Sequence, residues 1–231
     1  MIPLRDDNVP ARAPIVTRTL VGLCVLVFLW QMTLGSQGGQ AAVYALGVIP
    51  AVLLGRETLP AELALVPPPL TVLTSMFMHG GFMHLIGNML YLWIFGDNVE
   101  DSMTRPRYLV FYVLCGVAAV LAQALPDPDS TIPMVGASGA ISGVLGAYLL
   151  LFPHARVLVA IPLGFVLQTF RLPAGAVLAL WFVLQLVSNL FASGEGGVAF
   201  RAHLGGFIAG MLLITLFKRR DVVLRSPWGG R

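Results

Sequence analysis

The sequence predicts an all-α integral membrane protein, built as a bundle of six transmembrane helices. Its 231 residues are 57% hydrophobic and only 11% charged, whereas a water-soluble domain carries about 25% charged residues. Six apolar runs are long enough to cross a bilayer, which takes about 20 helical residues. These runs cover residues 15–34, 77–96, 108–125, 134–152, 173–192 and 198–217.

A seventh apolar run, Val157–Phe170, tests this count. It is short, carries Pro162 near its middle and lies between two arginines, so we expect a re-entrant or interfacial segment. With six spans and a cytoplasmic N-terminus, all of the fourteen Lys and Arg residues except Arg56 and Arg201 lie in the cytoplasm. A seventh span would move the basic C-terminal residues outside, against the positive-inside rule. Both termini are therefore expected in the cytoplasm.

The segments between the runs fit one membrane domain. Residues 1–14 are expected to form a cytoplasmic segment, 15–217 the membrane domain and 218–231 a basic, disordered cytoplasmic tail. The first run resembles a signal sequence but lacks an Ala-x-Ala cleavage site, so we expect a retained anchor. The first outer loop, 36–76, mixes apolar and charged residues and is expected to lie partly in the membrane interface. The connection 97–107 is expected to be solvated and held by local ion pairs.

The charge pattern excludes several function classes. The net charge is +3, but the basic residues flank apolar runs, where orientation in the bilayer explains them, so no nucleic-acid partner is expected. The central part of each run lacks Asp, Glu, Lys and Arg, which argues against an ion-coupled transporter or a channel. The two cysteines, Cys24 and Cys115, lie inside apolar runs without metal-binding spacing and are expected to be buried thiols.

Four polar residues are expected at one depth in the membrane. His84, Asn88, Ser138 and His203 all lie early in the second, fourth and sixth spans, which run from outside to inside in this topology. The chemistry that fits is acyl transfer, with Ser138 as nucleophile and His203 as general base and acid, without a carboxylate as third member. His84 and Asn88 are four residues apart on one helix face, where both could donate hydrogen bonds to an oxyanion.

Each of these residues also has a simpler interpretation. A serine in a membrane helix commonly bonds its own backbone, and a histidine or asparagine commonly bonds a neighbouring helix. Ser142 is a second hydroxyl one turn deeper than Ser138 and is a formal rival nucleophile. A metal site formed by His79, His84 and His203 is disfavoured because no His-Glu-x-x-His motif or nearby carboxylate accompanies them. His79 is expected to remain a loop or interface residue.

Three motifs together resemble a known family. Gly136-Ala137-Ser138-Gly139, Ala202-His203-x-x-Gly206-x-x-x-Gly210 and His79-x4-His84-x3-Asn88 are similar to the motifs of rhomboid intramembrane serine proteases. A Gly-x-Ser-Gly motif alone is weak, but three motifs in this order on these spans are specific.

The resemblance, which covers roughly residues 15–217, implies a Ser138–His203 dyad and an oxyanion hole that contains His84 and Asn88. It also implies that span five and the outer loop at 192–201 gate the lateral entry of substrates. The substrates would be single-pass or other membrane proteins in the lipid bilayer, cleaved near the outer surface, without a metal or organic cofactor.

Small residues around the site have an expected packing role. The glycines expected to let the fourth and sixth spans approach closely are Gly136, Gly139, Gly143, Gly206 and Gly210. One departure concerns the fourth span, because several members of the family carry an aromatic residue where this chain has Ser142. How His203 is held is therefore an open question at this point.

Two other functions remain as alternatives, a catalytically inactive relative that escorts membrane proteins and a small transporter or channel. The presence of all four polar residues argues against the first. The excess of arginine over lysine, with abundant Ala, Gly, Val, Leu and Pro, favours the cytoplasmic membrane of a bacterium.

Overall fold

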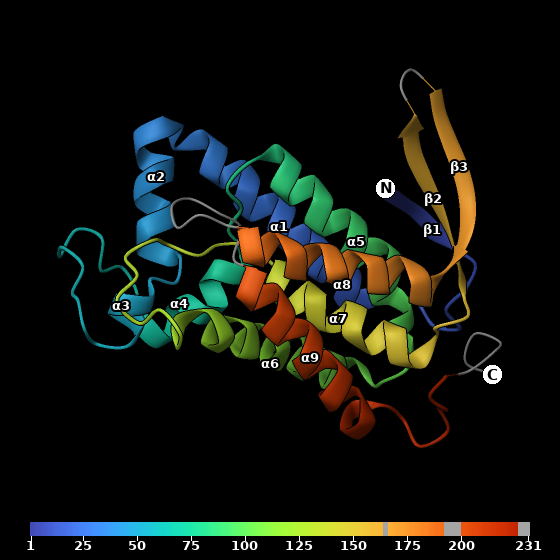
Figure 1. Cartoon of the computed structure of the whole chain (residues 1–231). Helices are drawn as coiled ribbons and strands as arrows, with labels where there is room; N and C mark the ends of the chain where they lie inside the picture. Colours follow the sequence, from blue (N-terminus) through green and yellow to red (C-terminus); the bar gives the residue numbers. More distant parts are fainter. Residues whose placement is uncertain (164–165, 192–199, 226–231) are drawn as a thin grey trace.

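The computed structural model describes residues 1–163, 166–191 and 200–225. The chain is mostly helical, but three strands form an antiparallel sheet, so the prediction of an all-α protein is wrong in this respect (Figure 1). In chain order the elements are β1 (Ile2–Asp6), α1 (Ile15–Thr33), α2 (Gly35–Leu46), α3 (Pro50–Leu53), α4 (Pro68–Thr74), the 3-10 helix η1 (Ser75–Phe77), α5 (Phe82–Asp101), α6 (Arg105–Ala124), α7 (Ser138–Leu151), β2 (Arg156–Leu163), β3 (Val166–Pro173), α8 (Ala174–Phe191) and α9 (Phe200–Phe217).

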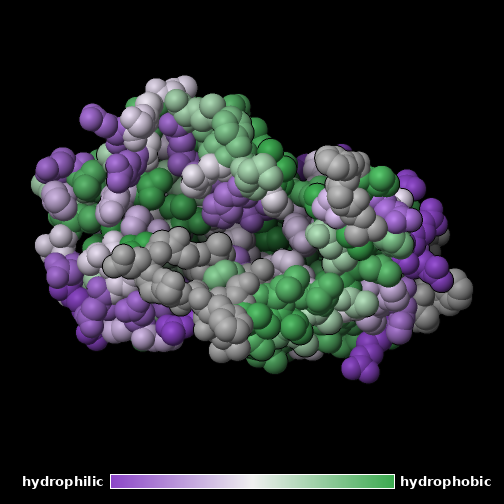
Figure 2. Space-filling view, turned by 45° about the horizontal axis from the view of Figure 1, so that its top comes forward, coloured by the Kyte–Doolittle hydropathy of each residue, from purple (hydrophilic) through white to green (hydrophobic). Residues whose placement is uncertain are grey.

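Six of the helices lie on the six apolar runs: α1, α5, α6, α7, α8 and α9. Among the described residues, α1, α6 and α9 are long and apolar enough to cross a membrane unaided. The segment 68–77 and α5 form a bent pair, with an angle of 82° between them, that would make a fourth crossing. Helix length alone therefore supports three or four crossings. In Figure 2, hydrophilic residues gather toward the two ends of the face shown, and a broad hydrophobic area lies between them.

Helix α7 occupies the middle of the bundle. It packs against α5, α6, α8 and α9, and none of its residues is exposed. Its 14 residues extend about 21 Å at 1.5 Å per residue, which is shorter than the hydrocarbon core of a bilayer. Because protein surrounds it, α7 has no need to match the thickness of the membrane.

The closest helix contact joins α7 to α9. A Cβ atom on Gly206 would collide with the carbonyl oxygen of Gly139, and a Cβ atom on Gly210 would collide with the carbonyl oxygen of Gly143. A Cβ atom on Gly146, which the sequence analysis did not select, would meet the carbonyl oxygen of Phe207. Glycine is therefore required where these two backbones touch.

The described residues of the run Val157–Phe170 form strands, which corrects the re-entrant alternative and leaves the interfacial one open. β2 pairs with both β1 and β3 in the order β1-β2-β3. Val157 and Val159 alternate with the less buried Leu158, as expected for a strand with one covered face. The partner that makes this possible is the N-terminal segment, whose backbone pairs along β2.

The segment 97–107 is not held by local ion pairs as predicted, because the carboxylates of Glu100 and Asp101, at the end of α5, bind distant residues. Glu100 is 4% exposed and accepts hydrogen bonds from the backbone N–H groups of Val16 (3.0 Å) and Thr17 (2.7 Å). The residue that precedes α1 is Pro14, whose side chain offers no cap. Glu100 therefore caps α1 in place of a local side chain, as a carboxylate at a helix N-terminus does.

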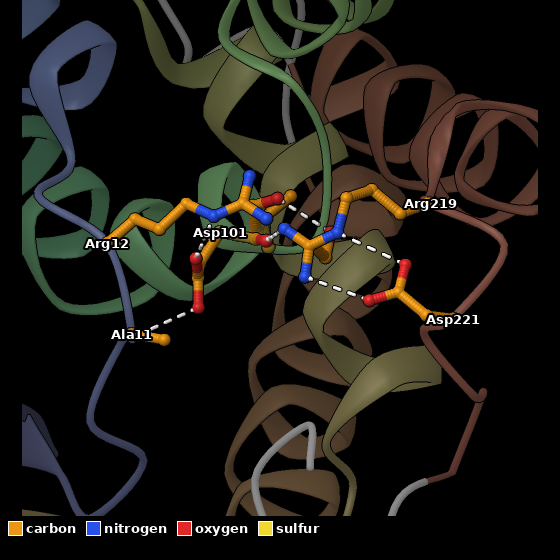
Figure 3. A network of polar contacts seen from close by, with 7 residues as sticks. Ala11, Arg12, Asp101, Arg219 and Asp221 are labelled. Carbon is orange, nitrogen blue, oxygen red and sulfur yellow. Dashed lines mark hydrogen bonds and ion pairs between the residues drawn. The ribbon is translucent and has the colours of Figure 1, made fainter.

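Asp101 joins the two ends of the chain to α5 (Figure 3). Its Oδ2 accepts the N–H of Ala11 at 2.8 Å, and Arg12 lies 3.9 Å from its Oδ1. Arg219 donates to the backbone oxygen of Asp101 and pairs with Asp221 at 3.3 Å. The tail was predicted to be disordered, but Val222 is buried, so its described part, up to 225, packs on the bundle. Residues 226–231 lie outside the described residues.

Asp6 links β1 to two helices. The hydroxyl of Tyr148 on α7 donates to its Oδ2, and Asn98 Nδ2 on α5 donates to the same oxygen at 3.1 Å. Burial raises the pKa of Asp6 to about 7. β1 is therefore part of the packed structure at the end of the bundle where α5 and α7 terminate.

Candidate active site

Ser138 and His203 meet at the N-terminal ends of α7 and α9. The distance between Ser138 Oγ and His203 Nε2 is 2.8 Å, although the two residues are 65 positions apart. This is the length of a strong hydrogen bond between a hydroxyl and a ring nitrogen. When Nε2 is unprotonated, the hydroxyl donates to it, which is the arrangement that a general base requires.

The segment before α7 fixes the position of Ser138. Val48 and Met134 exchange two backbone hydrogen bonds, of 3.0 and 2.7 Å, which tie this segment to the first outer loop. Gly136 donates its N–H to the carbonyl of Ser75 at 2.9 Å. Gly136 has φ 126°, a conformation that favours glycine. α7 begins at Ser138, and the first N–H groups of a helix have no acceptor within the helix.

The side chains of His84 and Asn88 lie next to Gly136. A Cβ atom at Gly136 would be 2.7 Å from His84 Nε2 and 3.6 Å from Asn88 Nδ2. The structure therefore brings both side chains next to the residue that lies two positions before Ser138. Gly136 was predicted to serve helix packing, but it precedes α7 and instead makes room for these two side chains.

Both side chains can donate a hydrogen bond beside Gly136, His84 through Nε2 and Asn88 through Nδ2. Gly80 N–H lies 3.4 Å from His84 Nδ1, so Nδ1 accepts this bond and Nε2 carries the proton of the neutral ring. Asn88 Nδ2 is buried and has no hydrogen-bond partner within the described part of the chain. Its acceptor is therefore left to water or to a bound molecule, which suits a hydrogen-bond donor for a developing negative charge.

His79 lies in the loop between η1 and α5, as predicted, but its side chain is buried. It is only 1% exposed, and its ring lies 5.3 Å from that of His84, measured between centroids. The side chain of Gln31 on α1 accepts the His79 N–H at 3.0 Å and donates to the His79 carbonyl at 3.2 Å. Gln31 thus holds the turn that leads into His84. The sequence analysis missed it, although an amide inside an apolar run was the available signal.

His203 packs against Trp181, while Ser142 bonds its own helix. The Ser142 hydroxyl donates to the carbonyl of Ser138 at 2.6 Å, one helical turn back, and Ser142 is buried. The ring of Trp181 on α8 lies 6.0 Å from that of His203 and stacks on Phe207 at 6.1 Å. Phe200 meets the His203 ring edge-on at 6.4 Å. The aromatic neighbours of His203 therefore come from α8 and α9, and sequence reasoning missed Trp181.

Two further predictions concern this region. The outer loop at 192–201, with its glycines at 194, 196 and 197, lies outside the described residues except for its last two positions. Within the described residues, no group of three His, Cys, Asp or Glu side chains could hold a metal ion.

Comparison with known proteins gives one family. The family model described as Rhomboid domain matches residues 69–220, a range that contains Ser138, His203, His84 and Asn88. Rhomboid protein 1, mitochondrial, of Saccharomyces cerevisiae is 33% identical over 62% of this chain and 40% of its own length. Rhomboid protease GluP of Bacillus subtilis is 32% identical over 60% of this chain and 24% of its own length. The chain therefore spans less than half the length of either relative.

Proposed function

Since the chain belongs to the rhomboid family, we propose that it is an intramembrane serine endopeptidase in which Ser138 is the nucleophile and His203 the general base. The observation that carries the proposal is the 2.8 Å contact between Ser138 Oγ and His203 Nε2. Two donors, on the half-buried His84 and the buried Asn88, lie beside the same segment. Nucleophile, base and oxyanion donors are the parts that acyl transfer needs.

The first half of the reaction forms an acyl-enzyme. Ser138 Oγ attacks the scissile carbonyl carbon while its proton passes to His203 Nε2. The negative charge that develops on the carbonyl oxygen is met by His84 Nε2–H, Asn88 Nδ2–H and the N–H groups at the start of α7. The intermediate then collapses, the C–N bond breaks, and the proton on His203 moves to the leaving amine.

The second half releases the product. Water attacks the ester on Ser138 and gives one proton to His203 Nε2. When the ester bond breaks, that proton returns to Ser138 Oγ and the new carboxyl product leaves. Each step balances with water as the sole co-reactant, so the cycle needs no cofactor.

The substrates and the topology follow from the same proposal. Six spans with both termini in the cytoplasm would place the dyad near the outer surface, since Ser138 and His203 begin helices that run inward. Transmembrane segments of other membrane proteins would enter from the bilayer. The relatives include a mitochondrial protein of Saccharomyces cerevisiae and a protein of Bacillus subtilis, and the arginine-rich composition favours a bacterial cytoplasmic membrane.

Labelling and cleavage test this function together. The purified protein should react with a fluorophosphonate, and peptide mapping should place the adduct on Ser138. In lipid vesicles it should cleave at least one member of a panel of single-span membrane proteins, as followed by mass spectrometry. Failure of both reactions with folded protein would favour a non-catalytic relative that binds membrane proteins.

Loss of either oxyanion donor should slow turnover. Asn88→Ala and His84→Ala are each expected to lower kcat by about 10²-fold, because the removed donor binds the charge of the transition state. Substrate KM should change little. Asn98→Ala is the matched control, since this buried asparagine lies on the same helix but bonds Asp6. Normal kcat in both Asn88→Ala and His84→Ala, measured per folded molecule, would refute the assignment.

Trp181 is expected to position His203. Trp181→Ala should lower kcat by up to about tenfold, because an aromatic contact contributes about 0.5–1.5 kcal/mol and its loss lets the imidazole tilt. Trp181→Phe should recover most of the rate, since a smaller ring can still pack on His203. Initial rates over a range of substrate concentrations separate kcat from KM. Equal rates for the Ala and Phe variants would show that the ring contact does not matter.

A further inference from the structure

The hairpin of β2 and β3 starts at the end of the bundle where α7 stops and α8 begins. The N–H of Ala174 donates to the carbonyl of Ala155 at 2.7 Å, and that of Gly175 donates to the carbonyl of Pro153 at 2.9 Å. The base of the hairpin is therefore fixed to two helix ends. From there each strand runs for eight residues, about 26 Å at 3.3 Å per residue.

The register of the sheet separates its two faces. Val157 and Val159 are fully buried. Their partners on β1, Asp6 for Val157 and Pro3 for Val159, face the helices as well. Since side chains alternate along a strand, this face, here called the bundle-side face, continues outward on β3. Its described members are Val157, Val159 and Ile161 on β2 with Val166, Gln168, Phe170 and Leu172 on β3.

Burial on the bundle-side face falls from base to tip. Val159 is 0% exposed, whereas its cross-strand partner Phe170 is 39% exposed and Val166, near the turn, is 65% exposed. Figure 1 shows β2 and β3 extending beyond the helices that their base contacts. The outer part of an apolar face is therefore left without protein cover, although it is turned toward the side on which the helices lie.

The opposite face carries the charge of the hairpin. Between 156 and 173 the only charged residues are Arg156 and Arg171, and both are exposed. Arg5 of β1 and Arg171 of β3 both pair with Leu158, so they share the face that points away from the helices. Farther out this face carries Pro162, Leu167 and Thr169, so its charge is confined to the base of the hairpin. Apolar residues beside exposed arginines suit the boundary between phospholipid headgroups and acyl chains.

The geometry points to the outer half of this hairpin as a membrane-surface anchor that lies flat in the cytoplasmic leaflet. Val166 and Phe170 face the acyl chains, and Arg5 and Arg171, at the base of the hairpin, face the headgroup phosphates and the cytoplasm. The inference takes the orientation of the bundle from the proposed function, which puts the ends of α7 and the start of α8 at the cytoplasmic surface. Lipid is the natural occupant because Val166 and Phe170 are apolar and uncovered, while the exposed arginines at the base can bind anionic headgroups.

Adjacent residues on opposite faces give a matched test. Phe170→Cys and Thr169→Cys lie one position apart on β3 and point to opposite faces. The two native cysteines are buried and can be replaced by serine in both variants. Each protein is labelled with a nitroxide and reconstituted in phosphatidylcholine–phosphatidylglycerol vesicles. Accessibility to oxygen, which concentrates in lipid, is compared with accessibility to a water-soluble nickel chelate.

The label at 170 is expected to be severalfold more accessible to oxygen than to the nickel chelate. The label at 169 is expected to be more accessible to the chelate. Chelate preference at both positions would overturn the inference, because the face would then be in water. Spin–spin broadening at 170 that disappears on dilution into excess lipid would also overturn it, in favour of a second copy of the chain. Neither readout depends on catalysis. Lipid contact at 170 in a protein that fails to label with fluorophosphonate would leave this inference standing and refute the proposed function.

Discussion

Ser138→Ala is expected to abolish peptide hydrolysis, with a fall in kcat of about 10⁴-fold or more. No covalent intermediate can form without Oγ, and the 2.8 Å contact with His203 Nε2 is lost. The same variant should lose fluorophosphonate labelling completely. Both readouts are made on protein that retains the wild-type melting temperature, so that loss of activity is not confused with unfolding.

Ser142→Ala is the matched control for this prediction. It removes a hydroxyl from the same helix one turn away, but that hydroxyl is engaged with the Ser138 carbonyl. Labelling should remain and kcat should stay within a few-fold of wild type. His203→Ala should behave like Ser138→Ala, since the base and the nucleophile act as a unit. Persistent labelling in Ser138→Ala that disappears in Ser142→Ala would reverse the assignment.

Gly206→Ala is expected to lower kcat by about 10²-fold, as much as the loss of an oxyanion donor, and to destabilise the fold as well. The added methyl group would collide with the carbonyl oxygen of Gly139, and backbone atoms cannot give way as a flexible side chain does. α9 must then move from α7 and carry His203 away from Ser138. A displacement of about 1 Å in a reacting group can cost 10²-fold in rate. A lower melting temperature should accompany the slower turnover.

Gly22→Ala is the control for helix glycines. An added Cβ atom at Gly22 in α1 would meet nothing within 4 Å, so rate and melting temperature should stay close to wild type. Fluorophosphonate labelling adds a second comparison, because it reports whether the dyad is assembled. Wild-type turnover in Gly206→Ala would show that the two helices can separate without disturbing Ser138 and His203.

The sequence could predict that Ser138, His203 and His84 lie close together, because the same local pattern recurs in three spans. Each of Ser138, His203 and His84 lies early in an apolar run, and the alternation of span directions brings such positions to one depth. The family resemblance then assigned roles to them. The contact between Trp181 and His203 could not be predicted from the sequence. The rotation of α8 about its axis decides which of its apolar residues faces Ser138 and His203.

The sheet was missed for a different reason. A short apolar run such as Val157–Phe170 has the composition of a buried strand and of an interfacial helix alike, and periodicity alone does not separate them. Its partner β1 lies about 150 residues earlier, in a segment that was expected to be a simple cytoplasmic extension. Pairing over that distance leaves no pattern within either segment.

The burial of α7 shields the proposed nucleophile from the physical state of the bilayer, because ten of the 14 residues of this helix are buried and none is exposed. A helix in contact with lipid must tilt or deform when membrane thickness changes, and that mismatch is a force on its position. Ser138 therefore lies on a helix that experiences little of this force directly. Changes in lipid chain length would reach the proposed catalytic serine mainly as movements of the helices packed around it.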